Sequence, residues 1–574
     1  MLTMKLMVEA ICQWWIALMM LVGIGHMIES GISSKNSRAV QMGTVWFGLT
    51  GFVCLIYLFN LFTGLVGWQL KTVIVLFAPL GIWETAKFLT VEAFLKRRPK
   101  LFDVFVGILF LFVIVLLSNW SIGSAQFGDS SLYHIGLVDY AAKYPVIPGL
   151  ANLHSRFGFN STTYLLSAVF QNGIWGIEGF RLANGFICIL VLFEVVNRVR
   201  KIAHLGFGDI SDYVLLIGLS IVIYSAIWIP STSISAPSPD LPAALLMLIA
   251  IVYSAKAFCI GDLENYGLAF CVAMLSFTFR PVTAPLVIFL FALIIHQILT
   301  RKRIQMLTVV TLSLSGLLLS MVVTRNIIIS GYVFYPSALR VSWLDWAVPK
   351  SSAEIDLNAI EAWAKTPAVP YAQVLQSNSW ISGWISRWKQ HFLLPLISIF
   401  LGCLVLVMAM RYNIKALLQN APIKLFISIA ILVAFWGYSA PDPRFAVGII
   451  AALVALPASW GIAQLGGRKI SKFTAVQLIL LFIVGAQFLY IALTPTYPYS
   501  TLFRKASPQF DTGFIPFQGA PTKSVVLNSG LVIQVPTDDK GCFRVEMCTV
   551  GVNSMTEGLV LRGMKITDGF RIED

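Results

Sequence analysis

Residues 126–160 read QFGDSSLYHIGLVDYAAKYPVIPGLANLHSRFGFN. Long hydrophobic runs precede and follow this stretch. The stretch itself concentrates polar side chains among aromatic ones: Asp129, His134, Asp139, Lys143, His154, Arg156 and Asn160. Ionisable groups at membrane depth are costly unless they pair or line a wet cavity. We therefore expect the stretch to form the mouth of a membrane-embedded active site.

The composition indicates a membrane protein. Of 574 residues, 57% are hydrophobic and 12% are charged, and the mean hydropathy is +0.81. A soluble globular protein carries about 25% charged residues. Repeated apolar runs indicate an all-α polytopic protein, with about fourteen spans of the length that a bilayer requires. The expected spans are 9–29, 42–64, 70–90, 101–119, 179–197, 212–230, 240–258, 265–279, 281–299, 304–323, 391–410, 423–438, 444–464 and 473–493.

The net charge of +14 is better explained by membrane topology than by nucleic-acid binding. The basic residues lie in short loops between apolar runs, as the positive-inside rule requires, and no basic domain or nucleic-acid-binding motif is present. If the loop at 91–100 is cytoplasmic, every other short basic loop falls on the same side. Both termini and the long loops 120–178 and 324–390 then face away from the cytoplasm. We expect a bacterial inner-membrane protein whose active site faces the periplasm.

This topology brings several polar motifs to the non-cytoplasmic face. They contribute Asp129 and Asp139, Asp240 in SAPSPD, Arg280 in FRP, Arg325 in TRN, and Asp442 with Arg444 in APDPRF. A shared cavity is the simplest account of five loops that each carry charge to one face.

Asp129 is the candidate general base, because a positioned carboxylate can take a proton from an acceptor hydroxyl or amine. The alternative is a helix N-cap, since Ser130 and Ser131 follow it. Asp139 lies ten residues further and about 80° around the same expected helix. It is a candidate for a supporting group or a metal ligand, and whether the site holds a divalent metal stays open.

The other polar residues are candidates for substrate binding. His134, Lys143, His154, Arg156 and Asn160 suit a sugar, a phosphate or a metal, although a lone histidine in a membrane protein is more often only hydrogen-bonded. Asp240 begins an expected helix, where a carboxylate is favourable whatever its function.

Arginines at non-cytoplasmic helix ends run against the positive-inside rule and need a partner. For Arg280, Arg325 and Arg444 that partner is a lipid phosphate or an interfacial carboxylate, as Asp442 would be for Arg444. The chain has no Walker loop, no GxGxxG and no HExxH motif. A transferase of this kind would therefore receive its donor from the membrane.

The chain divides into three parts: additional helices at 1–100, a membrane core at 101–493, and an extracytoplasmic tail at 494–574 with α+β or β-rich character. The run SVVLNSGLVIQVP predicts a hairpin around Asn528-Ser529-Gly530. Cys542 and Cys548 lie close together in the tail. A disulfide is favoured over a metal pair, because no further Cys or His lies nearby.

The outer loop with Asp129 followed by Tyr133, the turn at Asp240, the arginine-tipped helices and DPRF at 442–445 resemble the GT-C superfamily of membrane glycosyltransferases. That superfamily includes protein O-mannosyltransferases and the aminoarabinose transferase of lipid A. The runs PGLANLHSRFGFN and GCFRVEMC are similar to a bacterial branch of such proteins. This sequence departs from the pattern in having Ser130 where many relatives carry a second acidic residue, and three additional helices at its start.

The resemblance implies a sugar donor on polyprenyl phosphate or pyrophosphate and a glycan, lipid or protein acceptor. Asp129 would deprotonate the acceptor, which attacks with inversion, while Arg280, Arg325 or Arg444 holds the leaving phosphate. Two alternatives remain: a transporter or flippase for lipid-linked glycans, and an O-antigen-type polymerase or ligase. No internal repeat of the transporter kind is evident.

The topology can be tested by cysteine labelling on intact cells. Because every short basic loop falls on one side, a cysteine placed at Ser351 should react with a membrane-impermeant reagent, and one placed at Lys302 should react only after lysis. The reverse pattern would overturn the placement of all the outer motifs.

Overall fold

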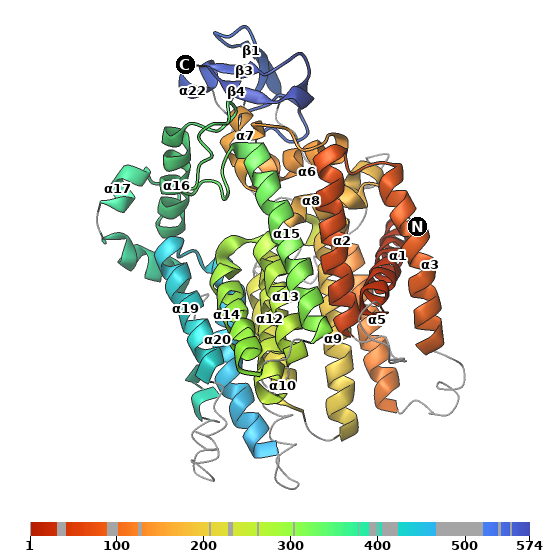
Figure 1. Ribbon diagram of the computed structural model, residues 1–574. Helices are drawn as coiled ribbons and strands as arrows, with labels where there is room; N and C mark the ends of the chain where they lie inside the picture. The colour runs from red at the N-terminus through yellow and green to blue at the C-terminus, as the bar shows by residue number, and fades with distance from the viewer. Residues whose placement is uncertain are drawn as a thin grey trace.

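The computed structural model describes residues 2–30, 42–88, 101–123, 129–205, 208–227, 234–260, 263–301, 305–376, 378–389, 396, 399–400, 402–404, 423–466, 521–537, 541–550 and 554–573. Long helices stand side by side in one bundle, with the short outer segments and the strands gathered at one end (Figure 1). The bundle helices are α1 (Leu2–Ser30), α2 (Met42–Phe62), α3 (Trp68–Phe88), α5 (Leu101–Ser121), α9 (Ala183–Leu205), α10 (Ile210–Ile227), α12 (Asp240–Ile260), α13 (Leu263–Phe279), α14 (Ala284–Arg301), α15 (Met306–Ser330), α19 (Ile423–Ser439) and α20 (Pro443–Gly466).

The helices support a membrane-embedded protein. Within the described residues, 8 helices are long and apolar enough to cross a membrane, and three shorter apolar helices accompany them. The expected span at 70–90 is the helix α3, which is not among the eight. The span expected at 473–493 and most of that at 391–410 lie outside the described residues, so the number fourteen stays a prediction.

Close helix contacts in the first part of the chain depend on glycine. A Cβ atom added at Gly25 on α1 would lie 1.8 Å from the carbonyl oxygen of Thr44 on α2, and one added at Gly48 on α2 would lie 1.9 Å from that of Leu21. Neither distance is physically possible for a real side chain. Small residues allow backbones to approach in this way in membrane helices, so α1 and α2 pack more tightly than larger residues would permit.

The first outer segment is a chain of short helices packed inside the protein. It comprises η1 (Ser130–His134), α6 (Ile135–Lys143), α7 (Leu150–Leu153), η2 (Ser155–Gly158), α8 (Thr162–Phe170) and η3 (Gly176–Leu182). Its position is fixed against the bundle, because the Asn60 side chain at the end of α2 donates to the carbonyls of Ala141 and Tyr144 at 3.3 and 3.1 Å. Helix α8 is almost entirely buried within the protein.

The second outer segment begins later than expected. Helix α15 continues to Ser330 and ends at Gly331, whose φ of 76° suits the left-handed conformation that often closes a helix. The segment then forms α16 (Lys350–Lys365) and α17 (Tyr371–Leu375). Residues 380–389 are helical, and the Trp384 indole donates to the carbonyl of Pro441 at 2.6 Å.

The described part of the tail is β-rich. Strand β1 (Thr522–Val526) pairs antiparallel with β2 (Val532–Pro536), and Gly530 in the turn has a φ of 82°. The hairpin expected around residues 528–530 is therefore confirmed. A second pair, β3 (Leu559–Leu561) and β4 (Phe570–Ile572), follows the short helix α22 (Ser554–Glu557).

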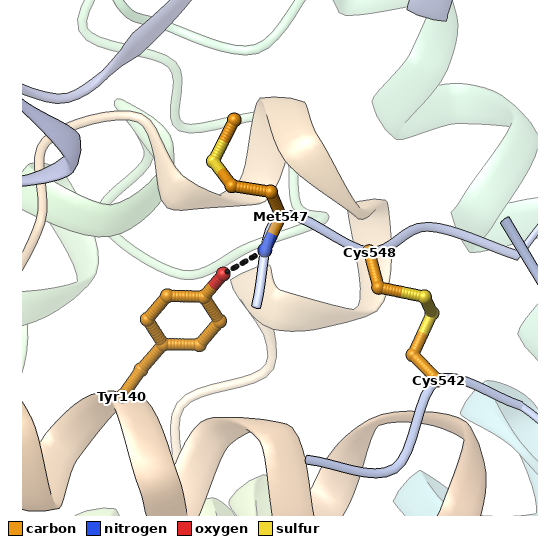
Figure 2. Close-up of a disulfide and its surroundings, with 4 residues drawn as sticks. All are labelled: Tyr140, Cys542, Met547 and Cys548. Carbon is orange, nitrogen blue, oxygen red and sulfur yellow. Dashed lines mark hydrogen bonds between the residues drawn. A yellow bond between two sulfur atoms is a disulfide. The ribbon is translucent and has the colours of Figure 1, made fainter. Parts of the chain in front are cut away.

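The tail contacts the first outer segment through a disulfide-closed loop. Cys542 and Cys548 form the disulfide that the sequence favoured. Between them, the backbone N–H of Met547 donates to the Tyr140 hydroxyl at 3.1 Å (Figure 2). Glu546 pairs with Lys143 at 2.7 Å. The loop therefore holds the tail against α6.

Thiol chemistry tests this closed loop. In protein purified without reductant, Cys542 and Cys548 should resist alkylation and react only after reduction, because the bridge leaves no thiol at either position. Peptide mass spectrometry would measure both states. Full labelling of both residues before reduction would contradict the bridge.

Candidate functional site

Asp129 stands at the start of the π-helix η1 and does not cap it. Its backbone is helical, with φ of −68° and ψ of −18°, and its side chain makes no capping hydrogen bond. Within the described residues its carboxylate also has no ion-pair partner. The N-cap alternative is therefore not what the structure contains. The half-buried carboxylate is available to another group.

Two arginines that act electrostatically on Asp129 are already fixed by carboxylates. Arg280 lies between α13 and η4 (Pro281–Thr283) and pairs with Asp240 at the start of α12, at 2.5 Å. Arg444 at the start of α20 pairs with Asp442 at 3.1 Å, and its backbone N–H donates to the same carboxylate at 2.9 Å. These pairs orient both guanidinium groups before any ligand binds.

Phe445 joins the two pairs. The Arg280 guanidinium lies 4.0 Å from its ring centroid, and that of Arg444 lies 5.6 Å from it. Guanidinium groups are attracted to aromatic faces at such distances. The helix ends that carry Asp240, Arg280 and Arg444 are thereby held together at one place.

Arg156 supplies a third guanidinium group and is held differently. It lies 5.9 Å from the Tyr133 ring and 5.7 Å from the Phe159 ring. Within the part of the chain that the structure describes, no carboxylate forms an ion pair with it. Arg156 is thus positioned by aromatic contacts, and its charge is not consumed by a salt bridge.

The electrostatics show that these groups share one environment. Burial raises the pKa of Asp129 above its ordinary value, and the positive charges of Arg156, Arg444 and Arg280 act in the opposite direction. Asp240 adds to the increase. A carboxylate with a raised pKa is a stronger base than an exposed one, which is the property that general-base catalysis uses.

His134 lies on the same helix, in an aromatic setting. Its ring centroid is 4.4 Å from that of Tyr133 and 5.3 Å from that of Tyr164. Burial lowers its pKa well below the usual value, and Arg280, Arg156 and Arg444 lower it further. His134 is therefore a neutral wall of the site.

Asp139 and Lys143 face the tail. The Asp139 carboxylate accepts a hydrogen bond from the Gln171 amide at 3.1 Å and lies 3.7 Å from the Arg544 guanidinium. Arg544 also lies 3.5 Å from Glu178, and Lys143 pairs with Glu546. Both sequence candidates hold the tail in place and do not reach Asp129.

Arg325 and Asn160 form a separate buried pair. The Arg325 guanidinium donates to the side-chain oxygens of Asn160 and Asn60, the latter at 3.0 Å. Arg325 is not among the main influences on the pKa of Asp129, whereas the three other arginines are. It connects α15, α2 and the first outer segment.

His154 is near the site but points elsewhere. Its Nδ1 accepts the Arg156 backbone N–H at 3.1 Å, and the residue lines a cavity beside α16. Asp356 on α16, which the sequence did not single out, lines the same cavity. Arg544 was likewise not anticipated, because its partners lie hundreds of residues away.

A metal site is not evident in the described ranges, which contain no group of three His, Cys, Asp or Glu side chains arranged to hold an ion. Asp240 and Asp442 instead pair with Arg280 and Arg444. The site can thus hold an anion and accept a proton with its own side chains.

Comparison with known proteins gives one match. A family model described as "Domain of unknown function (DUF8201)" matches residues 7–451. No curated protein and no solved structure matches the chain.

Stability should depend on pH through His154. Burial and Arg156 lower its pKa from 6.5 to about 4, so the unfolded state binds the proton first and stability is lost as pH falls from 6.5 towards 4. Through this histidine, the free energy of unfolding at pH 5 should be about 2 kcal/mol lower than at pH 8. His154→Asn removes that term, so the melting temperatures of wild type and variant should converge as pH falls. A difference in melting temperature between wild type and variant that stays constant with pH would contradict this prediction.

Proposed function

The chain belongs to the DUF8201 family, whose description assigns no function, and we propose that it is an integral-membrane glycosyltransferase. In this proposal a sugar moves from a polyprenyl-phosphate or pyrophosphate donor to an acceptor at the outer face. The observation that carries the proposal is the electrostatic coupling of Asp129 to Arg156, Arg280 and Arg444. Asp129 and Arg156 come from the first outer segment, Arg280 from the turn between α13 and η4, and Arg444 from the start of α20. A proton acceptor beside three guanidinium groups suits transfer away from a phosphate.

The proposed reaction balances in one displacement. The acceptor hydroxyl gives its proton to Asp129 as its oxygen forms a bond to the anomeric carbon. The bond from that carbon to the phosphate oxygen breaks, and the electron pair leaves with the phosphate. Attack opposite to the leaving group inverts the anomeric centre. The guanidinium groups stabilise the negative charge that develops on the phosphate.

The three arginines divide this work in the proposal. Arg280 and Arg444 already neutralise Asp240 and Asp442, so their main effect is to orient the donor. Arg156 has no carboxylate partner among the described residues, so no salt bridge there competes with a phosphate. We therefore assign Arg156 the principal phosphate contact, with Arg325 removed from that role by its buried amide partners.

Transport of a lipid-linked glycan is the second candidate. One observation favours it: a cavity of about 350 Å³ is lined by Glu194, Arg198 and Tyr253. Tyr253 lies thirteen residues beyond Asp240 on α12, roughly 20 Å along the helix axis. A polar cavity this far from the ion pairs at the start of α12 fits a second position on a substrate path. However, the buried pairs of Arg198 with Glu194 and Asp212, at 3.2 and 3.0 Å, also explain this cluster as structural.

Substitution of Asp129 separates the two candidates. Asp129→Asn keeps the size of the side chain but cannot accept the proton, so transfer should fall by about 10²–10⁴-fold while donor binding survives. Arg156→Ala should weaken donor binding instead. Transfer from a polyprenyl-phosphate donor and donor binding are measured in liposomes.

Asp139→Asn is the matched control, because the same chemical change is made at a carboxylate that contacts the tail. It should keep transfer within a few-fold of wild type. Near-normal transfer by Asp129→Asn would remove Asp129 as the base. The transporter would be favoured if the wild type formed no covalent product and Asp129→Asn reduced flipping of the lipid-linked glycan.

A further inference from the structure

A short helix of the second outer segment carries its apolar and polar residues on opposite sides. Residues 380–389 read WISGWISRWK and are helical. At about 100° per residue, its apolar residues fall within an arc of roughly 140°. They are Trp380, Ile381, Trp384, Ile385 and Trp388. The helix contains no acidic residue. It is called the outer amphipathic helix below.

The tryptophan edge of this helix contacts the protein. The Trp384 indole donates to the carbonyl of Pro441 at 2.6 Å, and its ring centroid lies 6.2 Å from that of Trp436 on α19. On the other side, the Lys365 ammonium at the end of α16 lies 5.1 Å from the Trp380 ring. The outer amphipathic helix is thereby fixed between α16 and α19.

The isoleucine edge of the same arc faces outward. Ile381 and Ile385 lie four residues apart on one side of the helix and are 43% and 54% exposed. Ser382 and Ser386, on the polar side, are also exposed. A single exposed apolar residue is ordinary on a protein surface. Here the apolar arc is continuous, and the protein covers the part with the tryptophans, so the isoleucine edge is suited to an apolar environment outside the chain.

The helix lies at the depth where apolar spans end. Trp436 belongs to the last turn of the apolar helix α19, and Pro441 follows two residues after that helix. Figure 1 shows the segment between α17 and α19. Tryptophans gather at membrane–water interfaces, where the ring meets apolar chains and the N–H meets a polar partner. The contacts of Trp384 with α19 and with Pro441 have this character.

Lipid suits the isoleucine edge better than a partner protein does. A helix of this length is about 15 Å long and about 10 Å wide, so one edge offers about 150 Å², against the 800 Å² or so that each partner buries in a stable complex. Lipid contact requires no such minimum, and it continues from α19, where Ile427 and Ile431 are 48% and 42% exposed. Lys389, one turn after Ile385, is exposed as well. A lysine beside an apolar edge can reach anionic headgroups.

We propose that the outer amphipathic helix binds the surface of the lipid bilayer. Ile381 and Ile385 enter the boundary between headgroups and acyl chains, and Lys389 meets the headgroup phosphates. The helix therefore lies along the membrane surface and does not span it. This contact is independent of the proposed transferase reaction.

The membrane contact has a consequence for the candidate site. The Trp436 indole donates to the backbone carbonyl of Asp442 at 2.9 Å, and Trp384 donates to that of the preceding residue, Pro441. Asp442 in turn pairs with Arg444. A helix held at the membrane surface thus sets the level of Arg444 relative to the lipid phosphates. This positioning role rests on the proposed function.

Photo-crosslinking in vesicles of phosphatidylethanolamine and phosphatidylglycerol tests the contact. In the full chain, p-benzoyl-phenylalanine is incorporated at one position at a time, in place of Ile381, Ile385, Ser382 or Ser386. After irradiation, peptide mass spectrometry measures the lipid adducts. The two isoleucine positions should give several-fold more adduct than the two serine positions, because the pairs lie on different sides of one helix.

Two results would overturn the membrane contact. One is equal adduct formation at all four positions, or none at Ile381 and Ile385. The other is crosslinking of the isoleucine positions to a second copy of the chain, which would assign the edge to a protein partner.

A double variant tests the positioning role. Ile381→Gln with Ile385→Gln removes the apolar edge and keeps residues that favour a helix. The KM for a donor carried in the membrane should rise several-fold while kcat is unchanged. Ser382→Gln with Ser386→Gln is the matched control and should change neither. An unchanged KM in the isoleucine variant, with lipid adducts present, would refute the positioning role.

The two proposals can fail separately. Lipid adducts at Ile381 and Ile385 in a chain without transferase activity would refute the glycosyltransferase and retain the membrane contact. Transferase activity without adducts at either isoleucine would refute the membrane contact and retain the glycosyltransferase.

Discussion

The ion pairs Arg280–Asp240 and Arg444–Asp442 determine how the ends of α12, α13 and α20 meet. A guanidinium group cannot be buried in an apolar environment without a partner, and a carboxylate cannot either. Pairing offsets the cost of burying both groups. The ring of Phe445, which both guanidinium groups contact, joins the two pairs into one unit. Once the ends of α12, α13 and α20 are fixed, they present a defined arrangement of charge that acts on Asp129. Neither Asp129 nor Arg156 forms an ion pair within the part of the chain that the structure describes.

The first outer segment connects this unit with the tail. One part of it carries Asp129 and Arg156. Another part carries Asp139 and Lys143, which contact Arg544 and Glu546 of the tail. Because the same short helices contact both, the disulfide-closed loop indirectly fixes the orientation of the site. A cavity of about 150 Å³ lies at the junction of these parts, and its walls come from residues 151–155, the beginning of α16 and the tail.

Several of these features could be predicted from the sequence. Composition indicated a helical membrane protein, and the turn residues indicated the β1–β2 hairpin. The sidedness of the basic loops was enough to bring Asp129, Arg280 and Arg444 to one face, because each lies at the end of an apolar run. The structure places these three in one electrostatic environment.

Other features leave no local pattern. Asp139 was grouped with Asp129 because both lie on one short stretch, but its partner Arg544 lies in the tail, and such a distant pairing has no periodicity to reveal it. Arg325 resembled the other helix-end arginines, yet α15 continues past it and buries it between amides. The importance of Asp356 likewise appears only when α16 is packed against residues 154 and 155.

The most direct test of the central claim is a cryo-EM map of the chain with bound polyprenyl phosphate. The account predicts phosphate density at hydrogen-bonding distance, about 2.7–3.2 Å, from the Arg156 guanidinium, with Arg280 or Arg444 beside it and Asp129 facing the space that the acceptor enters. Phosphate density at Arg325, or at the cluster around Arg198 with the Asp129 region empty, would contradict the account.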